Sequence, residues 1–361
     1  MKILLINDQF ERGGAGRVAC IQCNGLQKRG YDIVLISDSK HWRETYLVDK
    51  TIQRRDITVK TTTPGLIAKL IKWLKCSIKI RSIIKQETPD VIIAIQSMMF
   101  LCAYIGKIGL NIPIIAADHT SFDRKIDPII DFVRYRLYAW ADGLSILTKK
   151  DARLLGTKFP RKKVIYNPLT YPLLTTSTCR TQRVLCAGRL EDWNIKGFDR
   201  MIKMWAFLAP NNTDWKLEIA GSGTESSVSY LQDLIDNYGV SESVTLLGHV
   251  NNMKKLYEES AIFALPSRIE GFPMVLMEAM SQGCACVAFS IGGASDEMLD
   301  KNSGVIVPDG DLSKFQEELN NLMNNKELRD KCSMNALSTI SKFSEDVFLD
   351  AWENMINSVV N

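Results

Sequence analysis

The stretch AIFALPSRIEGFPMVLMEAMSQGCACVAFS, residues 261–290, decides the fold of this chain. It begins and ends with apolar runs of the kind that form strands of a parallel sheet covered on both faces. Between these runs, Pro273 suits the first turn of a helix and Gly283 suits the position just past a helix end. We therefore predict a strand, a helix and a second strand in one α/β unit.

The same alternation runs along the whole chain of 361 residues. Ten apolar runs read as buried strands: residues 2–7, 32–37, 90–96, 113–118, 143–148, 183–188, 216–221, 243–248, 261–267 and 285–290. Helix-length segments such as 16–29 and 66–86 separate them. The predicted fold class is α/β, with two doubly wound parallel sheets that each carry helices on both faces.

A domain boundary is predicted at Asn167-Pro168, because proline ends regular structure and a polar, threonine-rich stretch follows. The predicted domains are 1–168 and 169–341. The closing segment 342–361 is amphipathic. It either caps the second domain or crosses back to the first.

Charge divides along the same boundary. Residues 1–168 hold 29 Lys/Arg against 15 Asp/Glu, whereas residues 169–361 hold 16 against 26. The basic half could face phosphates or an anionic membrane surface. Nine scattered cysteines are typical of buried free thiols in a reducing cytoplasm. The chain start is not typical of a signal peptide, and no apolar run reaches the length of a membrane span.

Two glutamates in the opening stretch surround a predicted anion site. Glu270 lies in the loop after a strand, and Glu278 lies inside the following helix. Free N–H groups at the start of that helix favour a phosphate. Carboxylates on either side of a phosphate would suit the hydroxyls of a nucleotide sugar. The alternative is a solvated loop acid and a helix-surface acid.

A second candidate cluster is basic. Arg189 follows the strand that ends at Gly188, where ligands of open α/β sheets bind, and Lys196 precedes the next helix. These cations could neutralise a diphosphate leaving group. Two surface bases would give the same pattern.

Two further candidates lie in the first half. Glycines 13, 14 and 16 let backbone approach a ligand closely, although a plain flexible loop would contain them too. His119 ends a predicted strand after Asp118, either as a functional or as a structural histidine. The three histidines, His41, His119 and His249, lie in separate segments without a metal-binding motif. We therefore expect no metal site and no cofactor.

Segment 66–86 is a basic amphipathic helix. Its side chains could lie at an anionic membrane surface, or its apolar stripe could pack on the sheet. The membrane or acceptor candidates are Lys69, Lys72, Trp73 and Lys75.

Taken together, the motifs resemble the retaining glycosyltransferases of family 4, which have the GT-B fold. The motifs are GGAGRV, AGRL…KG, IAGSG, VTLLGHV and LPSRIEGFPMVLMEAMSQGCACVAFSIGG. The resemblance implies two Rossmann-like domains facing a central cleft, with acceptor on the first and nucleotide sugar on the second. It also implies that the C-terminal helix crosses back to the first domain.

The resemblance assigns roles to matching positions. Arg189 and Lys196 would hold the diphosphate, over a spacing longer than the family usually has. Glu270 would bind sugar hydroxyls, Glu278 the ribose, and His119 would lie near the reacting carbon. The remaining contacts to the nucleotide sugar would come from Gly14, His249, Val250, Gly271, Phe272 and Pro273.

The function so implied is transfer of a hexose or N-acetylhexosamine, with retention, from a UDP sugar to a saccharide. We expect a polyprenyl-diphosphate-linked acceptor in O-antigen or capsule assembly, and a cytoplasmic enzyme peripheral to the inner face of the membrane. No nucleic acid is expected as a partner. Two alternatives stay open: a UDP-N-acetylhexosamine 2-epimerase-like enzyme of GT-B architecture, and a non-catalytic, membrane-associated assembly protein.

Overall fold

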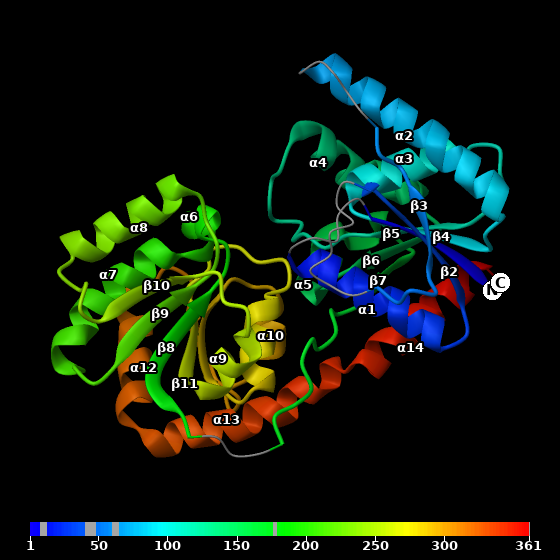
Figure 1. Cartoon of the computed structure of the whole chain (residues 1–361). Coiled ribbons are helices and arrows are strands. Elements are labelled where there is room, and N and C mark those ends of the chain that lie inside the picture. The colour runs from blue at the N-terminus through cyan, green and yellow to red at the C-terminus, as the bar shows by residue number, and fades with distance from the viewer. Residues whose placement is uncertain (8–12, 40–47, 60–64, 176–178, 361) are drawn as a thin grey trace. The chain divides into compact units, whose positions relative to one another are not determined.

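A computed structural model describes residues 1–7, 13–39, 48–59, 65–175 and 179–360. The chain forms two compact units (Figure 1). Unit 1 comprises residues 1–168 and 345–361, and unit 2 comprises residues 169–344.

Unit 1 is built on a seven-stranded parallel sheet of order β3-β2-β1-β4-β5-β6-β7. Its strands are β1 Lys2–Ile6, β2 Asp32–Ser37, β3 Gln53–Asp56, β4 Val91–Ile95, β5 Ile114–Ala117, β6 Gly143–Ile146 and β7 Lys162–Val164. Its helices are α1 Gly14–Lys28, α2 Leu66–Glu87, α3 Ser97–Lys107, α4 Pro128–Tyr135, α5 Lys149–Leu155 and α14 Glu345–Val360. The strands of its centre are apolar at every position, as expected of a sheet with helices on both faces.

Unit 2 is built on a six-stranded parallel sheet of order β10-β9-β8-β11-β12-β13. Its strands are β8 Thr181–Ala187, β9 Lys216–Ala220, β10 Val244–Gly248, β11 Ser260–Leu265, β12 Ala285–Ser290 and β13 Val305–Pro308. Its helices are α6 Trp193–Lys196, α7 Phe198–Leu208, α8 Glu225–Asn237, α9 Met253–Glu259, α10 Met274–Ser281, α11 Ala294–Met298, α12 Leu312–Asn324 and α13 Lys326–Ile340. All ten strands predicted from apolar runs are present, and β3, β7 and β13 add to them.

The last helix belongs to unit 1, although the helix before it belongs to unit 2. In Figure 1, α14 (red) runs beside α1 (blue). Leu349 of α14 packs so close to Gly25 of α1 that a β-carbon on the glycine would lie 2.5 Å from it. Arg29 bonds three carboxylates of α14: Asp346 at 3.2 Å, Asp350 at 2.7 Å and Glu353 at 2.5 Å. This helix begins at 345, whereas the sequence analysis began the closing segment at 342.

The cysteines lie mostly in the protein interior. Eight of the nine cysteines are buried and Cys179 is exposed. Burial raises the pKa of the Cys23, Cys186 and Cys286 thiols. Among the described residues, no helix is both long and apolar enough to cross a bilayer.

Candidate functional site

The strand order of unit 2 changes direction between β8 and β11, and ligands of open α/β sheets bind outside the carboxyl ends of strands at such a point. Lys196 and Glu270 follow these two strands. Lys196 Nζ lies 2.9 and 3.1 Å from the two Glu270 carboxylate oxygens. The Glu270 side chain is only 8% exposed, so it is not the solvated loop acid of the alternative interpretation.

Short contacts hold this pair in place. The Ser267 hydroxyl donates to Glu270 Oε1 at 2.7 Å. Gly197, next to Lys196, has φ +70 and lies against the backbone where β11 ends. A β-carbon on Gly197 would lie 1.8 Å from the Pro266 carbonyl oxygen, so only glycine fits.

Arg189 lies apart from the pair in the described contacts. Its side chain is 64% exposed and bonds Asp192 at 2.5 Å. The chain between Arg189 and Lys196 forms a short 3₁₀ turn and then α6. Trp193 in this segment stacks on Tyr230 of α8 with ring centroids 4.2 Å apart. This contact anchors the segment between Arg189 and Lys196, which is longer than the family usually has.

Helix α10 begins at Met274, so Pro273 lies one residue before the helix and not inside its first turn. Gly271 is half-buried, and the Phe272 ring packs edge-on against Phe343 at 5.7 Å. The helix ends at Ser281, and Gly283 takes φ +71 beyond it as predicted.

Glu278 is a buried carboxylate and not a helix-surface acid. Its Oε1 accepts a hydrogen bond from the Thr170 hydroxyl at 2.9 Å, and its Oε2 accepts one from the Tyr257 hydroxyl at 3.1 Å. Burial, together with the Glu278 charge, raises the pKa of Tyr257. Thr170 and Tyr257 therefore bind Glu278, whereas Lys196 and Ser267 bind Glu270.

Glycines join three strand ends at the same edge of this sheet. A β-carbon on Gly221 would lie 1.7 Å from the Gly188 carbonyl oxygen. The Gly221 N–H donates to the Gly248 carbonyl oxygen at 2.8 Å. His249 and Val250 follow directly, with His249 exposed and Val250 half-buried.

In unit 1, His119 follows β5 at the carboxyl edge of the sheet. Its Nδ1 is buried without a hydrogen-bond partner among the described residues. Burial lowers the pKa of His119 to about 4, against the opposing effects of the Asp118 charge and of the neighbouring Asn167 amide. The imidazole is therefore neutral at physiological pH.

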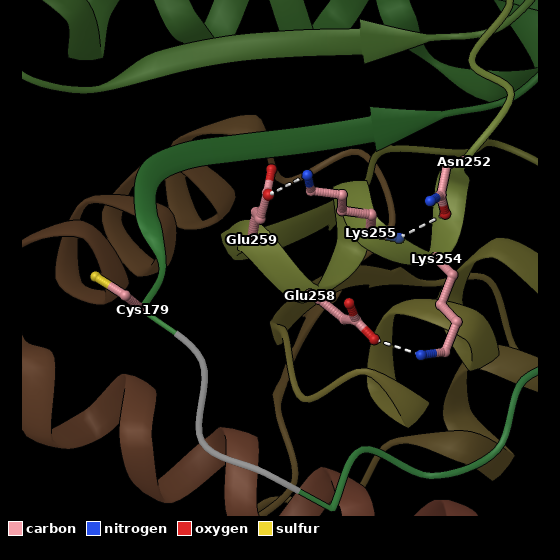
Figure 2. A pocket seen from close by; sticks show the side chains of 6 residues that line it. All are labelled: Cys179, Asn252, Lys254, Lys255, Glu258 and Glu259. Atoms are coloured by element: carbon pink, nitrogen blue, oxygen red, sulfur yellow. Dashed lines mark hydrogen bonds and ion pairs between the residues drawn. The ribbon is translucent and has the colours of Figure 1, made fainter.

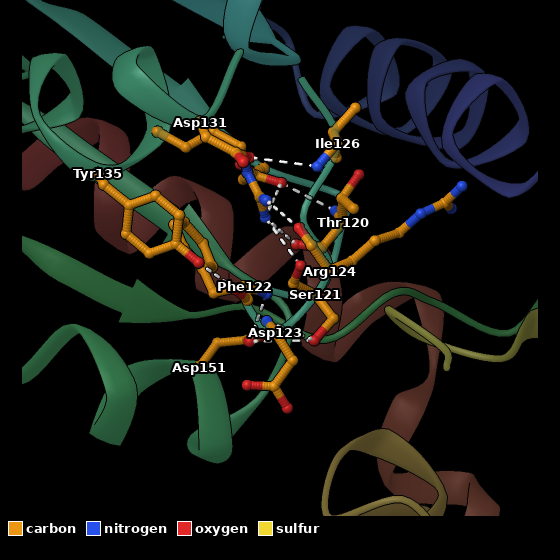
Figure 3. Close-up of polar contacts among 11 residues, drawn as sticks. Thr120, Ser121, Phe122, Asp123, Arg124, Ile126, Asp131, Tyr135 and Asp151 are labelled. Atoms are coloured by element: carbon orange, nitrogen blue, oxygen red, sulfur yellow. Dashed lines mark hydrogen bonds and ion pairs between the residues drawn. The ribbon is translucent and has the colours of Figure 1, made fainter. Parts of the chain in front are cut away.

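The loop after His119 is held by a buried arginine that the sequence analysis missed. Arg134 of α4 bonds the Asp118 carboxylate at 2.7 Å, and both side chains are almost fully buried. It also donates to the carbonyl oxygens of Thr120 at 2.6 Å and Ser121 at 3.0 Å. Figure 3 shows the same loop bonded to Asp151, whose carboxylate accepts from the Phe122 N–H at 2.9 Å.

Two other positions lie at the carboxyl edge of this sheet. Gly14 begins α1, after Gly13 with φ +102, while residues 8–12 of the glycine loop lie outside the described part. Gln96 follows β4 with φ 71 and ψ 152, a region occupied almost only by glycine. The sequence signal that could have singled out Gln96 is a polar residue at the end of an apolar strand.

Helix α2 turns one apolar stripe inward and another outward. Cys76, Ile80 and Ile84 are buried, and Trp73 packs against the same core. The exposed stripe consists of Leu70 at 51%, Ile71 at 45%, Leu74 at 57% and Ile78 at 61% exposure. The exposed lysines beside it are Lys69, Lys72 and Lys75. Trp73 therefore lies with the core and not with the other membrane candidates.

A surface pocket of about 410 Å³ lies beside α9 (Figure 2). Its charges pair with each other, Lys254 with Glu258 at 2.5 Å and Lys255 with Glu259 at 3.6 Å. Within the described ranges, no group of three His, Cys, Asp or Glu side chains could hold a metal ion. His41 lies outside those ranges.

Two family models match the chain, one in each half. Residues 12–170 match the model of glycosyltransferase family 4. Residues 180–339 match the model of the glycosyl transferases group 1.

Full-length relatives carry related names. An uncharacterised glycosyltransferase of Haemophilus influenzae is 27% identical over 349 residues, covering 95% of this chain and 96% of its own. A Campylobacter jejuni protein is 26% identical over 372 residues, covering 100% of this chain and 99% of its own. It is named GalNAc-α-(1→4)-GalNAc-α-(1→3)-diNAcBac-PP-undecaprenol α-1,4-N-acetyl-D-galactosaminyltransferase.

Among solved structures, Anabaena HepE in complex with UDP and glucose matches over 99% of this chain and 100% of its own, with a TM-score of 0.81. The sequence identity is 17%, so this likeness concerns the fold.

Proposed function

The chain belongs to the family 4 glycosyltransferases of the GT-B fold, and on this premise we propose that it transfers a hexose or N-acetylhexosamine from a UDP sugar, with retention, to a lipid-linked saccharide. Unit 2 would bind the nucleotide sugar and unit 1 the acceptor. The observation that carries the proposal is the half-buried Lys196–Glu270 pair at the direction change between β8 and β11.

The charged residues of unit 2 are of the kinds that would bind the two ends of a nucleotide sugar. Lys196 and Arg189 would bind the diphosphate, while Glu270 would bind sugar hydroxyls and Glu278 the ribose. When the bond between the sugar and the diphosphate breaks, negative charge grows on the phosphate oxygen, and a fixed cation stabilises that charge most in the transition state. The acceptor hydroxyl would attack from the leaving-group side and give its proton to the departing phosphate, which retains the configuration.

His119 would contribute from unit 1. A neutral imidazole can accept or donate one hydrogen bond to a sugar hydroxyl without placing a second cation near the reacting carbon. The bonds of Arg134 and Asp118 fix the loop that carries it.

The acceptor class is proposed from the names of relatives. The Campylobacter relative acts, by its name, on an undecaprenyl-diphosphate saccharide, and its length matches that of this chain. We propose an acceptor of the same class, used in assembly of a surface polysaccharide such as O-antigen or capsule. A UDP donor is favoured because the structural neighbour binds UDP and glucose.

A panel of nucleotide sugars tests the reaction. Purified protein is incubated with UDP and GDP sugars, with and without a polyprenyl-diphosphate saccharide, and the products are separated by mass. We expect release of one nucleoside diphosphate, accelerated by the acceptor. Epimerisation of a UDP sugar without acceptor would favour the epimerase alternative. Failure of every sugar would contradict the enzyme proposal.

Metal independence is part of the proposal, because arginine, lysine and a helix N-terminus would neutralise the diphosphate. Transfer should survive EDTA with less than about a twofold loss. A loss restored by Mg²⁺ or Mn²⁺ would show that a cation shares this role.

Membrane contact through α2 is proposed separately. Its exposed stripe would enter the headgroup region of an anionic inner leaflet, and Lys69, Lys72 and Lys75 would face lipid phosphates. Flotation with phosphatidylglycerol vesicles should recover the wild type. Leu70→Ser/Leu74→Ser/Ile78→Ser should stay unbound. Phe207→Ser, at a site 67% exposed in unit 2, is the matched control and should float normally. Equal flotation of all three proteins would exclude this surface.

A further inference from the structure

We infer that Arg200 is a positioning residue that sets the separation of Lys196 and Glu270. Arg200 does not reach either side chain directly. It acts on the backbone of the loop that carries Glu270, from the helix that follows Lys196. The consequence for catalysis rests on the proposed function, whereas the consequence for geometry does not.

The contacts of Arg200 converge on the end of β11. Its Nε donates to the Pro266 carbonyl oxygen at 2.5 Å, and its Nη2 donates to the Ser267 carbonyl oxygen at 2.6 Å. The planar guanidinium also lies 3.9 Å from the ring centroid of Phe289. A fork held by two carbonyls and one ring has a single orientation, so it fixes the backbone it binds.

Ser267 passes this constraint to the site. The Ser267 carbonyl oxygen accepts from Arg200, while the Ser267 hydroxyl donates to Glu270 Oε1 at 2.7 Å. On the other side, Gly197 separates Lys196 from α7, and the Gly197 backbone packs directly against the Pro266 carbonyl. Arg200 therefore joins the segment that carries Glu270 to the segment that carries Lys196.

Burying the Arg200 charge costs folding free energy, which argues against a purely structural role at the surface. The side chain is 7% exposed, and Asp309, which pairs with it at 3.1 Å, is 49% exposed. Burial lowers the pKa of Arg200 in spite of that partner. A buried charge with an incomplete counter-ion destabilises a fold unless its hydrogen bonds compensate, and here the two shortest bonds go to the site loop.

A second connection joins the same two segments. The Arg268 N–H donates to the Ile195 carbonyl oxygen at 2.8 Å. The Arg268 guanidinium bonds both carboxylate oxygens of Asp199 at 2.7 Å each. With Arg200 on one side and Arg268 on the other, the segments 194–200 and 266–270 form one rigid block.

The test uses Arg200→Lys, which keeps the charge but replaces the fork by one flexible ammonium. Arg329→Lys is the matched control. Arg329 also donates to two carbonyls, Leu322 at 2.6 Å and Met323 at 2.8 Å, and lies 5.2 Å from the Trp215 ring. The Lys196–Glu270 pair is not among the described contacts of Arg329, so Arg329→Lys reports the general cost of losing such an arginine.

The first readout compares UDP with the UDP sugar that the wild type uses. UDP would engage only the Lys196 side of the site, while the sugar engages both sides. We expect Arg200→Lys to lower kcat by about tenfold to a hundredfold, as a misplacement of about 1 Å does, with less than about a threefold change in UDP affinity. Arg329→Lys should leave both values unchanged. An unchanged kcat in Arg200→Lys would overturn the inference.

The second readout needs no donor. In the wild type, Lys196→Met and Glu270→Gln should lower the unfolding midpoint non-additively, because the two side chains are in contact. The non-additivity should disappear in the Arg200→Lys background and persist in the Arg329→Lys background. Its persistence with Arg200→Lys would overturn the inference. The non-additivity could also be lost in a protein that uses no nucleotide sugar. That result would leave the inference about Arg200 standing and would contradict the proposed function.

A folding defect does not block the test. If Arg200→Lys loses its cooperative unfolding transition, Arg200→Gln replaces it, because a neutral amide costs less to bury than an unpaired ammonium. The same kcat, UDP affinity and non-additivity are then measured, with the same expected and contradicting results.

Discussion

Single residues decide the chemistry of the site, and Glu270 is the sharpest example. Replacement by Gln keeps the volume but removes the charge that Lys196 binds. We expect Glu270→Gln to lower sugar transfer at least a hundredfold, or about 3–4 kcal/mol, because a preorganised polar contact to the transition state is lost. Single-turnover transfer of the labelled donor measures this loss.

Glu191→Gln is the control for that experiment, because Glu191 is an exposed carboxylate in the loop that leads to Lys196. It should transfer sugar at the wild-type rate. Equal losses in the two variants would mean that net charge, and not the Glu270 contact, matters.

His119 makes a residue-level prediction about pH. Its folded-state pKa is about 4, below the ordinary value of 6.5, so between these values the unfolded chain binds a proton that the native chain does not. Stability therefore rises with pH through this window and levels off above it. Unfolding midpoints at several pH values should rise less steeply for His119→Gln than for the wild type. Parallel curves would show that His119 is not held neutral.

At this scale, the sequence predicted the ionic groups but not their supports. Lys196 and Glu270 each follow an apolar strand, and strand order brings such positions together. Arg200 and Arg134 sit in amphipathic helices, where an arginine usually faces water. Besides Asp118 and Asp309, their partners are backbone carbonyls of loops, which leave no mark in the sequence.

At the scale of elements, Gly197 fixes how α6, α7 and β11 meet. Gly197→Ala places a β-carbon 1.8 Å from the Pro266 carbonyl oxygen, so the two segments must separate. We expect a fall in the unfolding midpoint and a loss of transfer. The matched control is Gly239→Ala, with φ +67 but nothing within 4 Å of the added carbon.

The comparison separates two costs. Both substitutions force alanine into a left-handed conformation, which lowers the free energy of unfolding by about 1–2 kcal/mol. Only Gly197→Ala adds the collision, so its midpoint should fall further. Equal midpoints would show that the backbone yields at no cost.

The elements that sequence analysis missed share one property, which is the lack of a long apolar run. The strand β3 reads QRRD and lies at the sheet edge, where one neighbouring strand suffices to hold it.

For α2, the sequence shows one broad apolar pattern, and only the packing of α3 against it separates the buried stripe from the exposed one. The packing of Trp73 against the core of unit 1 is part of this difference between the two stripes.

At the scale of the whole molecule, α14 ties the stability of unit 1 to residues made far along the chain. Trp352 of α14 is 1% exposed. Trp352→Ala should destabilise unit 1 by about 3–5 kcal/mol, because a large buried side chain leaves a cavity. Limited proteolysis should then cut unit 1 first and leave unit 2 intact. Val347→Ala, at a position 52% exposed on the same helix, should digest like the wild type. Simultaneous digestion of both units would contradict their independence.

The split of unit 1 across the sequence also sets an order of events in time. A ribosome must synthesise residues 169–344 after residue 168 before α14 emerges, which takes on the order of 10–35 s. During that interval, the surface around Gly25 and Gly143 that later receives Leu349 and Met355 stays uncovered. Nascent unit 1 is therefore open to chaperones and to aggregation for the whole synthesis of unit 2, and a pause in translation within unit 2 would lengthen that exposure.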